Sequence, residues 1–443
     1  MACIPKSKNN PASAIDKILS ACLPEGAAVA VGLSGGMDSV SLLEATLPLQ
    51  GRWKILVCHV NHGISLHANS WERFCRRLCE KKNIPIIVCR VPTPPVVASE
   101  DWARQQRMAA FAGLSVKAVL AAHHANDQAE TVLFRLLRGS GVCGMAAMRP
   151  CATLPGASHI QLLRPWLHIG RDNVARYARR QKLSWVEDED NDNLSRRRNF
   201  LRQRALPILS EGFPDCGTLL AAAAPRFAED ADLLADLAHW DEKKAAANGE
   251  GFSLVYWQNV GLARVGNWLR TSLFERRASG ARRHVDEAAR QIMAANADSS
   301  VCFKFRHTCL RAWRGRLFWD DTPSPPSDFV LPLKAAEARL PLEELGGTLM
   351  LSRTRGKGLS TAKIADGLLL RLRQGGERLS IIGRPRRAVA DLLREAEIMP
   401  WRRMLLPLLF VRGRLAAVPG IATAADFVAA PDENGLECGF EWR

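Results

Sequence analysis

Residues 27–39 read AAVAVGLSGGMDS, an apolar run that ends in a glycine-rich turn and then passes into a helical pattern. Glycine lets the backbone turn tightly and approach a ligand closely. The amide N–H groups of such a turn and of the following helix start converge on one spot, where the helix dipole also favours negative charge. Ser34 and Ser39 add hydroxyl groups, and Asp38 adds a carboxylate that can hold a metal ion. The stretch therefore predicts a strand, a turn and a helix arranged around a phosphate or pyrophosphate.

The SGGMDS turn also has a purely structural interpretation, in which Asp38 simply caps the helix after a glycine turn. It is not a Walker loop, because no lysine followed by Ser or Thr comes after its second glycine. The complete six residues, placed after a buried-strand pattern, favour the phosphate site over the bare turn.

The first half of the chain alternates strand and helix patterns. In the helical pattern at residues 67–82, apolar side chains recur at three- and four-residue spacing and form one stripe. This alternation predicts a doubly wound parallel α/β sheet with helices on both faces. Ligands of such sheets bind at the carboxyl ends of the strands, so motifs that follow different strands should meet in one crevice. The predicted strands are residues 27–33, 53–60, 84–91 and 116–122.

The segment HVNHG, residues 59–63, follows the second predicted strand. His59 and His62 can contact phosphate or act as an acid or base near neutral pH. The structural alternative is a turn whose backbone is set by Asn61 and Gly63. The position at a strand end favours the functional interpretation.

The segment HHANDQAET, residues 123–131, follows the fourth predicted strand. Asp127 and Glu130 are three residues apart and share a helix face, so they can hold a metal ion or receive an ammonium group. The D-x-x-E spacing at a helix start also resembles a capping box, and both interpretations hold if the cap faces the crevice.

Residues 188–202, DEDNDNLSRRRNFLR, place acidic residues and asparagines before a run of arginines that includes Arg198 and Arg202. Arginine binds phosphate in a bidentate fork, which favours a clamp for phosphate or RNA. The structural alternative is a solvated charged loop that leads into a helix.

The chain of 443 residues has 61 Lys and Arg against 45 Asp and Glu, a net charge of +16. This excess, with arginine clusters in the middle and near the C-terminal end, favours a nucleic-acid partner over a merely basic enzyme surface. The 12 cysteines include no C-x-x-C pair, so neither a zinc ribbon nor a dithiol redox motif is indicated. Without a signal peptide or an apolar run of bilayer length, we expect a cytoplasmic protein that does not bind membranes.

Length and breaks in the pattern predict several domains. We place an α/β catalytic domain at residues 1–215, a helical domain at 216–320 and a small α+β domain at 330–443. A long alanine-rich helix is expected at residues 225–246, with its proline tolerated in the first turn. The Pro- and Ser-rich residues 321–327 are typical of a linker.

Together these segments resemble the tRNA(Ile)-lysidine synthetases, a family of PP-loop ATP pyrophosphatases. The likeness includes SGGMDS, HVNHG, HHANDQAET followed by RGSG, and the segments ARQQR at 103–107, RP at 164–165, RNFLR at 198–202, PWRR at 400–403 and LAAVPG at 415–420. It covers nearly the whole chain and is weakest around residues 220–350. The chain departs from the family at Ile64-Ser65, where many members carry an arginine, and at Asn126, where many have a second aspartate.

The resemblance implies an ATP- and Mg²⁺-dependent ligation of L-lysine to C2 of the wobble cytidine in tRNA(Ile) with a CAU anticodon. ATP would adenylate the C2 oxygen and release pyrophosphate, and the lysine ε-amine would then displace AMP to leave lysidine, which changes codon reading from AUG to AUA. The residues implied to bind the nucleotide are Ser34, Gly35, Gly36, Met37, Asp38, Ser39, His59, Asn61 and Arg107, with Asp38 as the metal ligand. Catalytic roles fall on Asp38, Asp127, Glu130 and Arg198, and substrate binding falls on Asp127, Glu130, Arg198 and Arg202.

Two other functions stay open from the residues alone. A PP-loop tRNA thiolase would also adenylate a base, although many such enzymes use paired cysteines or an iron–sulfur cluster. A non-catalytic tRNA-binding protein with a relic nucleotide site would retain tRNA without releasing pyrophosphate. The sequence also leaves open whether the protein is a monomer or a homodimer. The C-terminal arginines are expected to bind tRNA away from the anticodon: Arg384, Arg386, Arg387, Arg402, Arg403 and Arg412.

Overall fold

The computed structural model describes residues 10–91, 99–187, 193–247, 249–278, 280–297, 299, 301–321, 325–334, 336 and 338–442. The chain divides into two compact units, Met1–Leu234 and Ala235–Arg443. The division falls inside one long helix, α10 (Cys216–Ala245). The expected boundaries of three domains therefore stay a prediction, and part of the expected linker, residues 322–324, lies outside the described residues.

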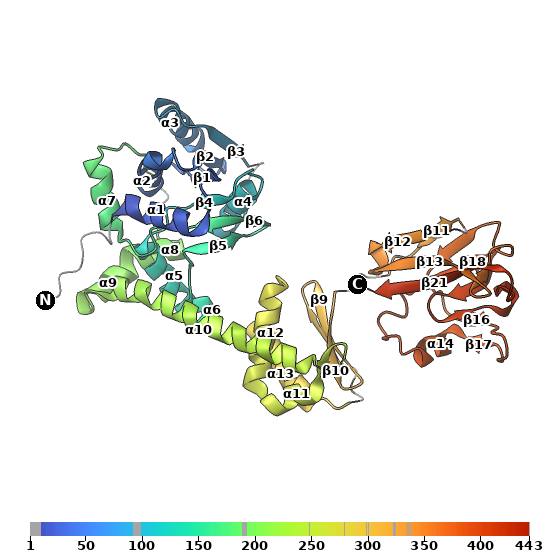
Figure 1. Ribbon diagram of the computed structural model, residues 1–443. Coiled ribbons are helices and arrows are strands. Elements are labelled where there is room, and N and C mark those ends of the chain that lie inside the picture. The colour runs from blue at the N-terminus through green and yellow to red at the C-terminus, as the bar shows by residue number, and fades with distance from the viewer. Residues whose placement is uncertain are drawn as a thin grey trace. The chain divides into compact units, whose positions relative to one another are not determined.

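Within the described residues, the N-terminal unit is built around a six-stranded sheet of order β3-β2-β1-β4-β6-β5 (Figure 1). Neighbouring strands run parallel, except that β5 pairs with β6 antiparallel at the edge. The strand order reverses between β1 and β4, which is the point where sheets of this class bind ligands. The strands are β1 (Ala28–Gly32), β2 (Lys54–Asn61), β3 (Ile86–Arg90), β4 (Ala118–Leu120), β5 (Cys151–Leu154) and β6 (Ala157–Leu163).

Helices cover both faces of this sheet, which confirms the predicted doubly wound fold. Successive strand side chains point to opposite faces, so Val29 and Val31 of β1 pack in the core with α1, α2, α3 and α7, whereas Ala30 packs in the core that contains Phe111 of α4. The helices are α1 (Pro11–Cys22), α2 (Met37–Thr46), α3 (Ala68–Lys81), α4 (Glu100–Ala112), α5 (Ala125–Leu137), α6 (Val142–Met145), α7 (Arg171–Arg180), α8 (Arg197–Phe200) and α9 (Leu206–Gly212).

The predicted helical stripe of residues 67–82 is confirmed in α3. Cys75 and Cys79 are fully buried there, and Phe74 and Leu78 pack partly buried against the same core. The long alanine-rich helix begins earlier than predicted, at Cys216, so that Pro225 lies inside α10 and not in its first turn. Four alanines directly precede this proline, and alanine is the strongest helix former, so the helix continues through the position.

The C-terminal unit begins with the last part of α10 and continues with helices α11 (Leu254–Val260), α12 (Leu262–Glu275) and α13 (Arg282–Ala294). These pack on an antiparallel sheet of order β7-β10-β9-β8 that the prediction of a helical domain did not include. Trp257 and Trp268 stack in this core with ring centroids 4.3 Å apart. The strands are β7 (Phe252–Ser253), β8 (Cys302–Phe305), β9 (Thr308–Trp313) and β10 (Arg316–Asp320).

The remaining residues form sheets of order β11-β15-β18-β19-β20 and β12-β13-β21-β14, a β16-β17 pair and one short helix, α14 (Val389–Glu395), among the described residues. This agrees with the small α+β domain that we predicted, although strands predominate. The strands are β11 (Val330–Leu333), β12 (Ala338–Leu342), β13 (Gly347–Arg355), β14 (Leu359–Ser360), β15 (Leu368–Arg371), β16 (Arg378–Leu379), β17 (Arg387–Ala388), β18 (Leu408–Val411), β19 (Arg414–Val418), β20 (Ala422–Thr423) and β21 (Asn434–Trp442).

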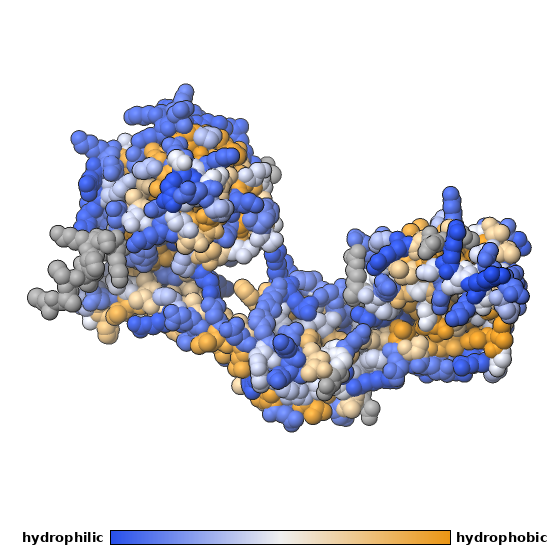
Figure 2. Space-filling model, viewed as in Figure 1, coloured by the Kyte–Doolittle hydropathy of each residue, from blue (hydrophilic) through white to orange (hydrophobic). Residues whose placement is uncertain are grey.

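Hydrophilic residues cover much of the surface seen in Figure 2, with hydrophobic patches between them. Exposed apolar side chains include Ile208 of α9, Phe213 directly after α9, and Leu219 and Leu233 of α10. Across the part of the chain that the structure describes, no helix combines the length and apolar character needed to cross a bilayer.

Candidate active site

The SGGMDS turn connects β1 to α2, and the Ser39 hydroxyl closes it from inside. Ser39 Oγ accepts hydrogen bonds from the backbone N–H groups of Ser34 at 3.1 Å and Gly35 at 3.2 Å, and it donates to the Gly36 carbonyl at 2.9 Å. Ser39 is buried, whereas Ser34 is exposed. The turn is thus held in shape by its own side chain before any ligand binds.

The start of α2 offers backbone donors to an anion. Gly36 occupies the N-cap position of α2 and makes no side-chain cap. The N–H groups in the first turn of a helix have no partner within the helix, and the helix dipole adds positive potential there. With Ser34 exposed beside them, these donors fit a phosphate group, as the sequence predicted.

Asp38, in the first turn of α2, faces the start of α5. Its Oδ2 atom lies 3.7 Å from Nε2 of His124, and its Oδ1 atom is buried without a hydrogen-bond partner among the described residues. Magnesium prefers oxygen ligands and is commonly held by one or two carboxylates together with substrate phosphates. The unpartnered Oδ1 beside the phosphate-binding turn therefore fits a Mg²⁺ ligand. Among the described residues, no three His, Cys, Asp or Glu side chains form a metal-binding group of their own.

The start of α5 is closed by a capping box, but not by the one that the D-x-x-E spacing suggested. His124 is the N-cap: its Nδ1 accepts the Asp127 N–H at 3.3 Å, and Asp127 Oδ2 accepts the His124 N–H at 2.9 Å. Asn126, where the sequence departs from the pattern of the family that it resembles, accepts the Arg171 N–H at the start of α7 at 3.0 Å. Asp127 therefore uses Oδ2 in the cap of α5, and its Oδ1 atom can accept a hydrogen bond from another group.

Asp127 and Glu130 lie on one face of α5, and Arg202 binds both. Arg202 Nε donates to Glu130 Oε1 at 2.6 Å, and Nη2 donates to Glu130 Oε2 at 3.1 Å and to Asp127 Oδ1 at 3.2 Å. Glu130 is only 1 % exposed, and burial raises the pKa of its carboxyl, against the opposing effect of Arg202. For Arg202, burial acts to lower the pKa, but the bond to Glu130 and the nearby carboxylates outweigh it and raise the pKa. The pair of carboxylates is thus a cation-binding site.

His124 links the two carboxylate groups of the crevice. It is 2 % exposed and lies between Asp38 and Asp127, with Nδ1 at 3.4 Å from Asp127 Oδ2. Burial acts to lower the pKa of its imidazole, but the hydrogen bond to Asp38 and the charges of Asp127 and Asp38 outweigh burial and raise it. We assigned no role to His124 from the sequence. Its signal was its position as the residue three before Asp127, directly after the fourth strand.

The end of β2 contributes His59 and Asn61, which are both buried. His59 Nδ1 lies 2.8 Å from the Leu33 carbonyl, and its Nε2 has no hydrogen-bond partner among the described residues. Asn61 Nδ2 donates to Asn69 at 3.2 Å and to Glu72 at 3.0 Å, and its Oδ1 accepts the Gly63 N–H. His59 thus has a nitrogen available for a ligand, whereas the polar atoms of Asn61 organise the turn. Nucleotide binding by either residue stays a prediction.

A second group of residues at the strand ends is strongly basic. Burial, with the charges of Arg107 and His59, lowers the pKa of His62 to about 4. Burial, with the charges of Arg164, Arg107 and Arg104, also lowers the pKa of His123 well below its ordinary value. The predicted Arg107 therefore lies where its charge reaches both histidines.

The basic group continues through two further arginines. Arg164 is buried, and burial together with the charge of Arg104 lowers its pKa to about 10. Burial lowers the pKa of Arg135, with contributions from the charges of Arg104 and Arg198. The positive charges of these arginines repel one another, and a bound anion would reduce this repulsion. The predicted Arg198 belongs to this group, whereas residues 188–192 of its segment lie outside the described residues.

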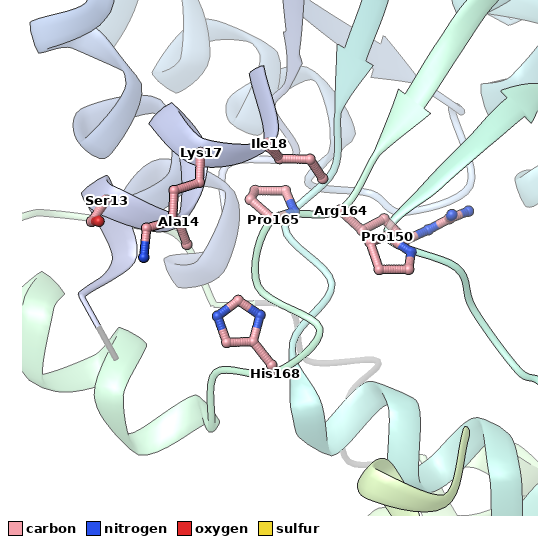
Figure 3. A pocket seen from close by; sticks show the side chains of 8 residues that line it. All are labelled: Ser13, Ala14, Lys17, Ile18, Pro150, Arg164, Pro165 and His168. Carbon is pink, nitrogen blue, oxygen red and sulfur yellow. The ribbon is translucent and has the colours of Figure 1, made fainter. Parts of the chain in front are cut away.

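The groups near the carboxyl ends of the strands thus divide into an acidic half at α2 and α5 and a basic half around His62 and His123. A separate cavity of about 260 Å³ lies beside α1 and the segment after β6, where Lys17 and His168 line it (Figure 3). The Arg164 side chain points away from His168 in this view. None of the predicted site residues lines this cavity, but Arg164 of the basic group does, so the cavity adjoins that group.

Comparison with known proteins gives matches over both ends of the chain. The profile of the PP-loop domain matches residues 8–209, and that of the TilS substrate C-terminal domain matches residues 368–442. The chain is 34 % identical to the tRNA(Ile)-lysidine synthase of Nitrosomonas europaea, over 94 % of this chain and 93 % of that protein. It is 36 % identical to that of Azoarcus sp., over 91 % and 89 %, and 36 % identical to that of Xylella fastidiosa, over 94 % and 96 %.

Proposed function

Because this chain belongs to the tRNA(Ile)-lysidine synthase family, we propose that its crevice joins L-lysine to the wobble cytidine of tRNA(Ile) with a CAU anticodon. The supporting observation is the meeting of a phosphate-binding turn and a carboxylate pair across His124, at the switch point of the sheet. ATP activation needs the first feature, and an ammonium substrate needs the second.

The first step is adenylation of the cytidine. The C2 oxygen of the base attacks the α-phosphate of ATP, an O–P bond forms, and pyrophosphate leaves. The turn around Gly36 and the start of α2 would hold the pyrophosphate, since their N–H groups are aimed where negative charge develops. Mg²⁺ held by Asp38 would neutralise part of the phosphate charge. The group of Arg107, Arg164 and Arg198 would hold the remaining phosphate oxygens or the RNA backbone.

The second step is attack by lysine. The ε-amine must lose a proton before it attacks C2, and free lysine keeps this proton at neutral pH. Asp127 and Glu130 would bind the ammonium, and the raised pKa of Glu130 suits it to accept a proton. As the C2–N bond forms, the C2–O bond breaks, and AMP leaves.

The C-terminal unit would supply further contacts to tRNA. Arg384, Arg386 and Arg412 are exposed, as a phosphate-binding surface requires. The described cysteines are free thiols, in keeping with the cytoplasmic location that we expect for tRNA modification. Monomer and homodimer both fit this proposal, and light scattering of the purified protein with and without tRNA distinguishes them.

The decisive experiment incubates the full-length protein with ATP, Mg²⁺, labelled lysine and either tRNA(Ile) with CAU or tRNA(Met). We expect label only in tRNA(Ile), with one pyrophosphate released for each lysine added. Asp38→Asn should slow this reaction by at least about 100-fold. Asp172→Asn removes an exposed carboxylate on α7 and should leave the rate unchanged.

Three results would contradict the proposal. The first is sulfur from a labelled donor entering the tRNA in place of lysine, which indicates a thiolase. The second is tRNA binding without pyrophosphate release, which indicates a binding protein. Full activity of Asp38→Asn would refute the assignment of the metal ligand.

A further inference from the structure

The carboxylates proposed to bind the lysine ammonium already hold a cation of the chain itself. Arg202 spans Asp127 and Glu130 with donor–acceptor distances of 2.6, 3.1 and 3.2 Å. An incoming ammonium would compete for the same oxygens, since Arg202 already donates to both oxygens of Glu130 and Asp127 uses its other oxygen in the cap of α5. Arg202 and lysine are therefore rivals for this carboxylate pair.

Arg202 reaches this pair from the outer side. Its side chain is 38 % exposed, whereas that of Glu130 is 2 % exposed. Removal of the arginine without replacement would leave a buried carboxylate without a cation, which is costly. Exchange of a guanidinium for an ammonium keeps the charge balanced, so the two occupants can differ little in free energy.

The backbone that carries Arg202 has an unusual local structure. Residues Leu201–Ala205 form a π-helical turn between α8 and α9. Such turns are rare, and they occur frequently at functional sites. Leu201 anchors the turn in a buried position, whereas Arg204 is exposed. Arg196, Arg197 and Arg198 lie a few residues before this turn in the chain.

We propose that Arg202 is a gate on the lysine site: it holds Asp127 and Glu130 until a phosphate group draws its guanidinium away. This proposal rests on the proposed function, because it assumes that the carboxylate pair receives lysine. The competing phosphate comes either from bound tRNA or from the nucleotide. In both cases lysine gains access only after the first substrate is bound, which prevents lysine from occupying the crevice unproductively.

The test measures binding of labelled L-lysine to the full-length protein by equilibrium dialysis. The three arms contain the protein alone, the protein with a non-hydrolysable ATP analogue and Mg²⁺, and the protein with tRNA(Ile). Lysine affinity should rise at least about tenfold in one of the occupied arms, and that arm identifies the source of the phosphate. Equal affinity in all three arms overturns the gate, and this result requires no variant.

Variants then assign the effect to Arg202. Arg202→Met keeps an unbranched side chain and removes the charge, so lysine should bind the protein alone at least about tenfold more tightly than it binds wild type. Neither added ligand should then raise the affinity further. The control Arg180→Met removes an exposed arginine at the end of α7, outside the segment that carries Arg202, and should behave as wild type. Unchanged or weaker lysine binding by Arg202→Met in the protein alone overturns the gate.

Glu130→Gln separates failure of the gate from failure of the proposed site. If Glu130→Gln binds lysine as well as wild type does, the assignment of the carboxylate pair is wrong, and the gate is wrong with it. If Glu130→Gln loses lysine binding while Arg202→Met changes nothing, only the gate is wrong.

Discussion

Gly35 should be the least replaceable residue of the phosphate-binding turn. Its φ angle is +95°, a region that L-residues rarely adopt. A Cβ atom at this position would lie 3.0 Å from Val186 Cγ2 and 3.4 Å from Cys75 Sγ. Val186 cannot easily move aside, because its own N–H donates to the Gly35 carbonyl at 3.0 Å.

The cost of Gly35→Ala can be worked from these contacts. The backbone conformation costs about 1–2 kcal/mol for an L-residue, and crowding of a packed position adds about 1–3 kcal/mol. We expect the free energy of unfolding to fall by about 2–5 kcal/mol. In a unit of this size, this corresponds to a decrease of roughly 4–20 °C in Tm.

The neighbouring glycine provides a matched control. Gly36 has φ −74° and ψ 162°, which any residue adopts, and a Cβ there would meet only Ser34 Oγ, at 3.7 Å. Gly36→Ala should therefore change the stability by less than about 0.5 kcal/mol. The two variants differ only in which of two adjacent glycines gains a methyl group.

Differential scanning calorimetry of the full chain measures the unfolding transition that the PP-loop unit contributes. The double variant Gly35→Ala/Val186→Ala should recover the part of the loss that is due to crowding, but not the part that is due to the backbone. Equal Tm values for the two single variants, within about 1 °C, would refute the steric argument.

Three further predictions follow from other contacts. Hydrogen bonds from Arg90 and further donors lower the pKa of buried Glu72 to about 2, so its ionised form stabilises the fold above pH 4.5, and this stabilisation is lost as the pH falls toward 2. Because Arg90 is exposed, Glu72→Gln should lower the free energy of unfolding by only about 1–2 kcal/mol at pH 7. In urea unfolding, the difference in this free energy between wild type and variant should vanish near pH 2, and a difference that does not change with pH contradicts the argument. Gln128 bonds both the N–H and the carbonyl of Met148, so Gln128→Leu should cost about 1–3 kcal/mol in urea unfolding, and an unchanged midpoint would show that these bonds contribute nothing. Truncation after residue 320 should weaken tRNA binding at least about tenfold and leave ATP binding unchanged, and the tRNA affinity of the full chain should fall steeply as the salt concentration rises. Equal tRNA affinity of the full and truncated chains would refute the role of the C-terminal residues in tRNA binding.

The sequence was informative wherever function depends on local backbone chemistry. Residue spacing predicts the glycine turn at Gly35 and Gly36, the strand before it and the apolar stripe of α3, because these elements depend on residues that are close in the sequence. The convergence of three motifs also followed, since the carboxyl ends of parallel strands share one edge. The predicted start of the long helix at Pro225 was wrong. We placed the proline in the first turn, but the helix-forming alanines before it extend the helix toward the N-terminus.

By itself, the sequence determined the phosphate-binding turn, the α/β class and the residues that meet at the crevice, because each depends on a local pattern. Only the tertiary structure decided which groups those residues contact. His124 lies between Asp38 and Asp127, and Arg202 spans Asp127 and Glu130 from 72 positions farther along the chain than Glu130. Such contacts depend on how β1, β4 and the segment after α7 come together, and no periodicity in the chain encodes that geometry. The turn at Gly35 could be predicted from the sequence, whereas the binding of Arg202 to the carboxylate pair could be seen only in the tertiary structure.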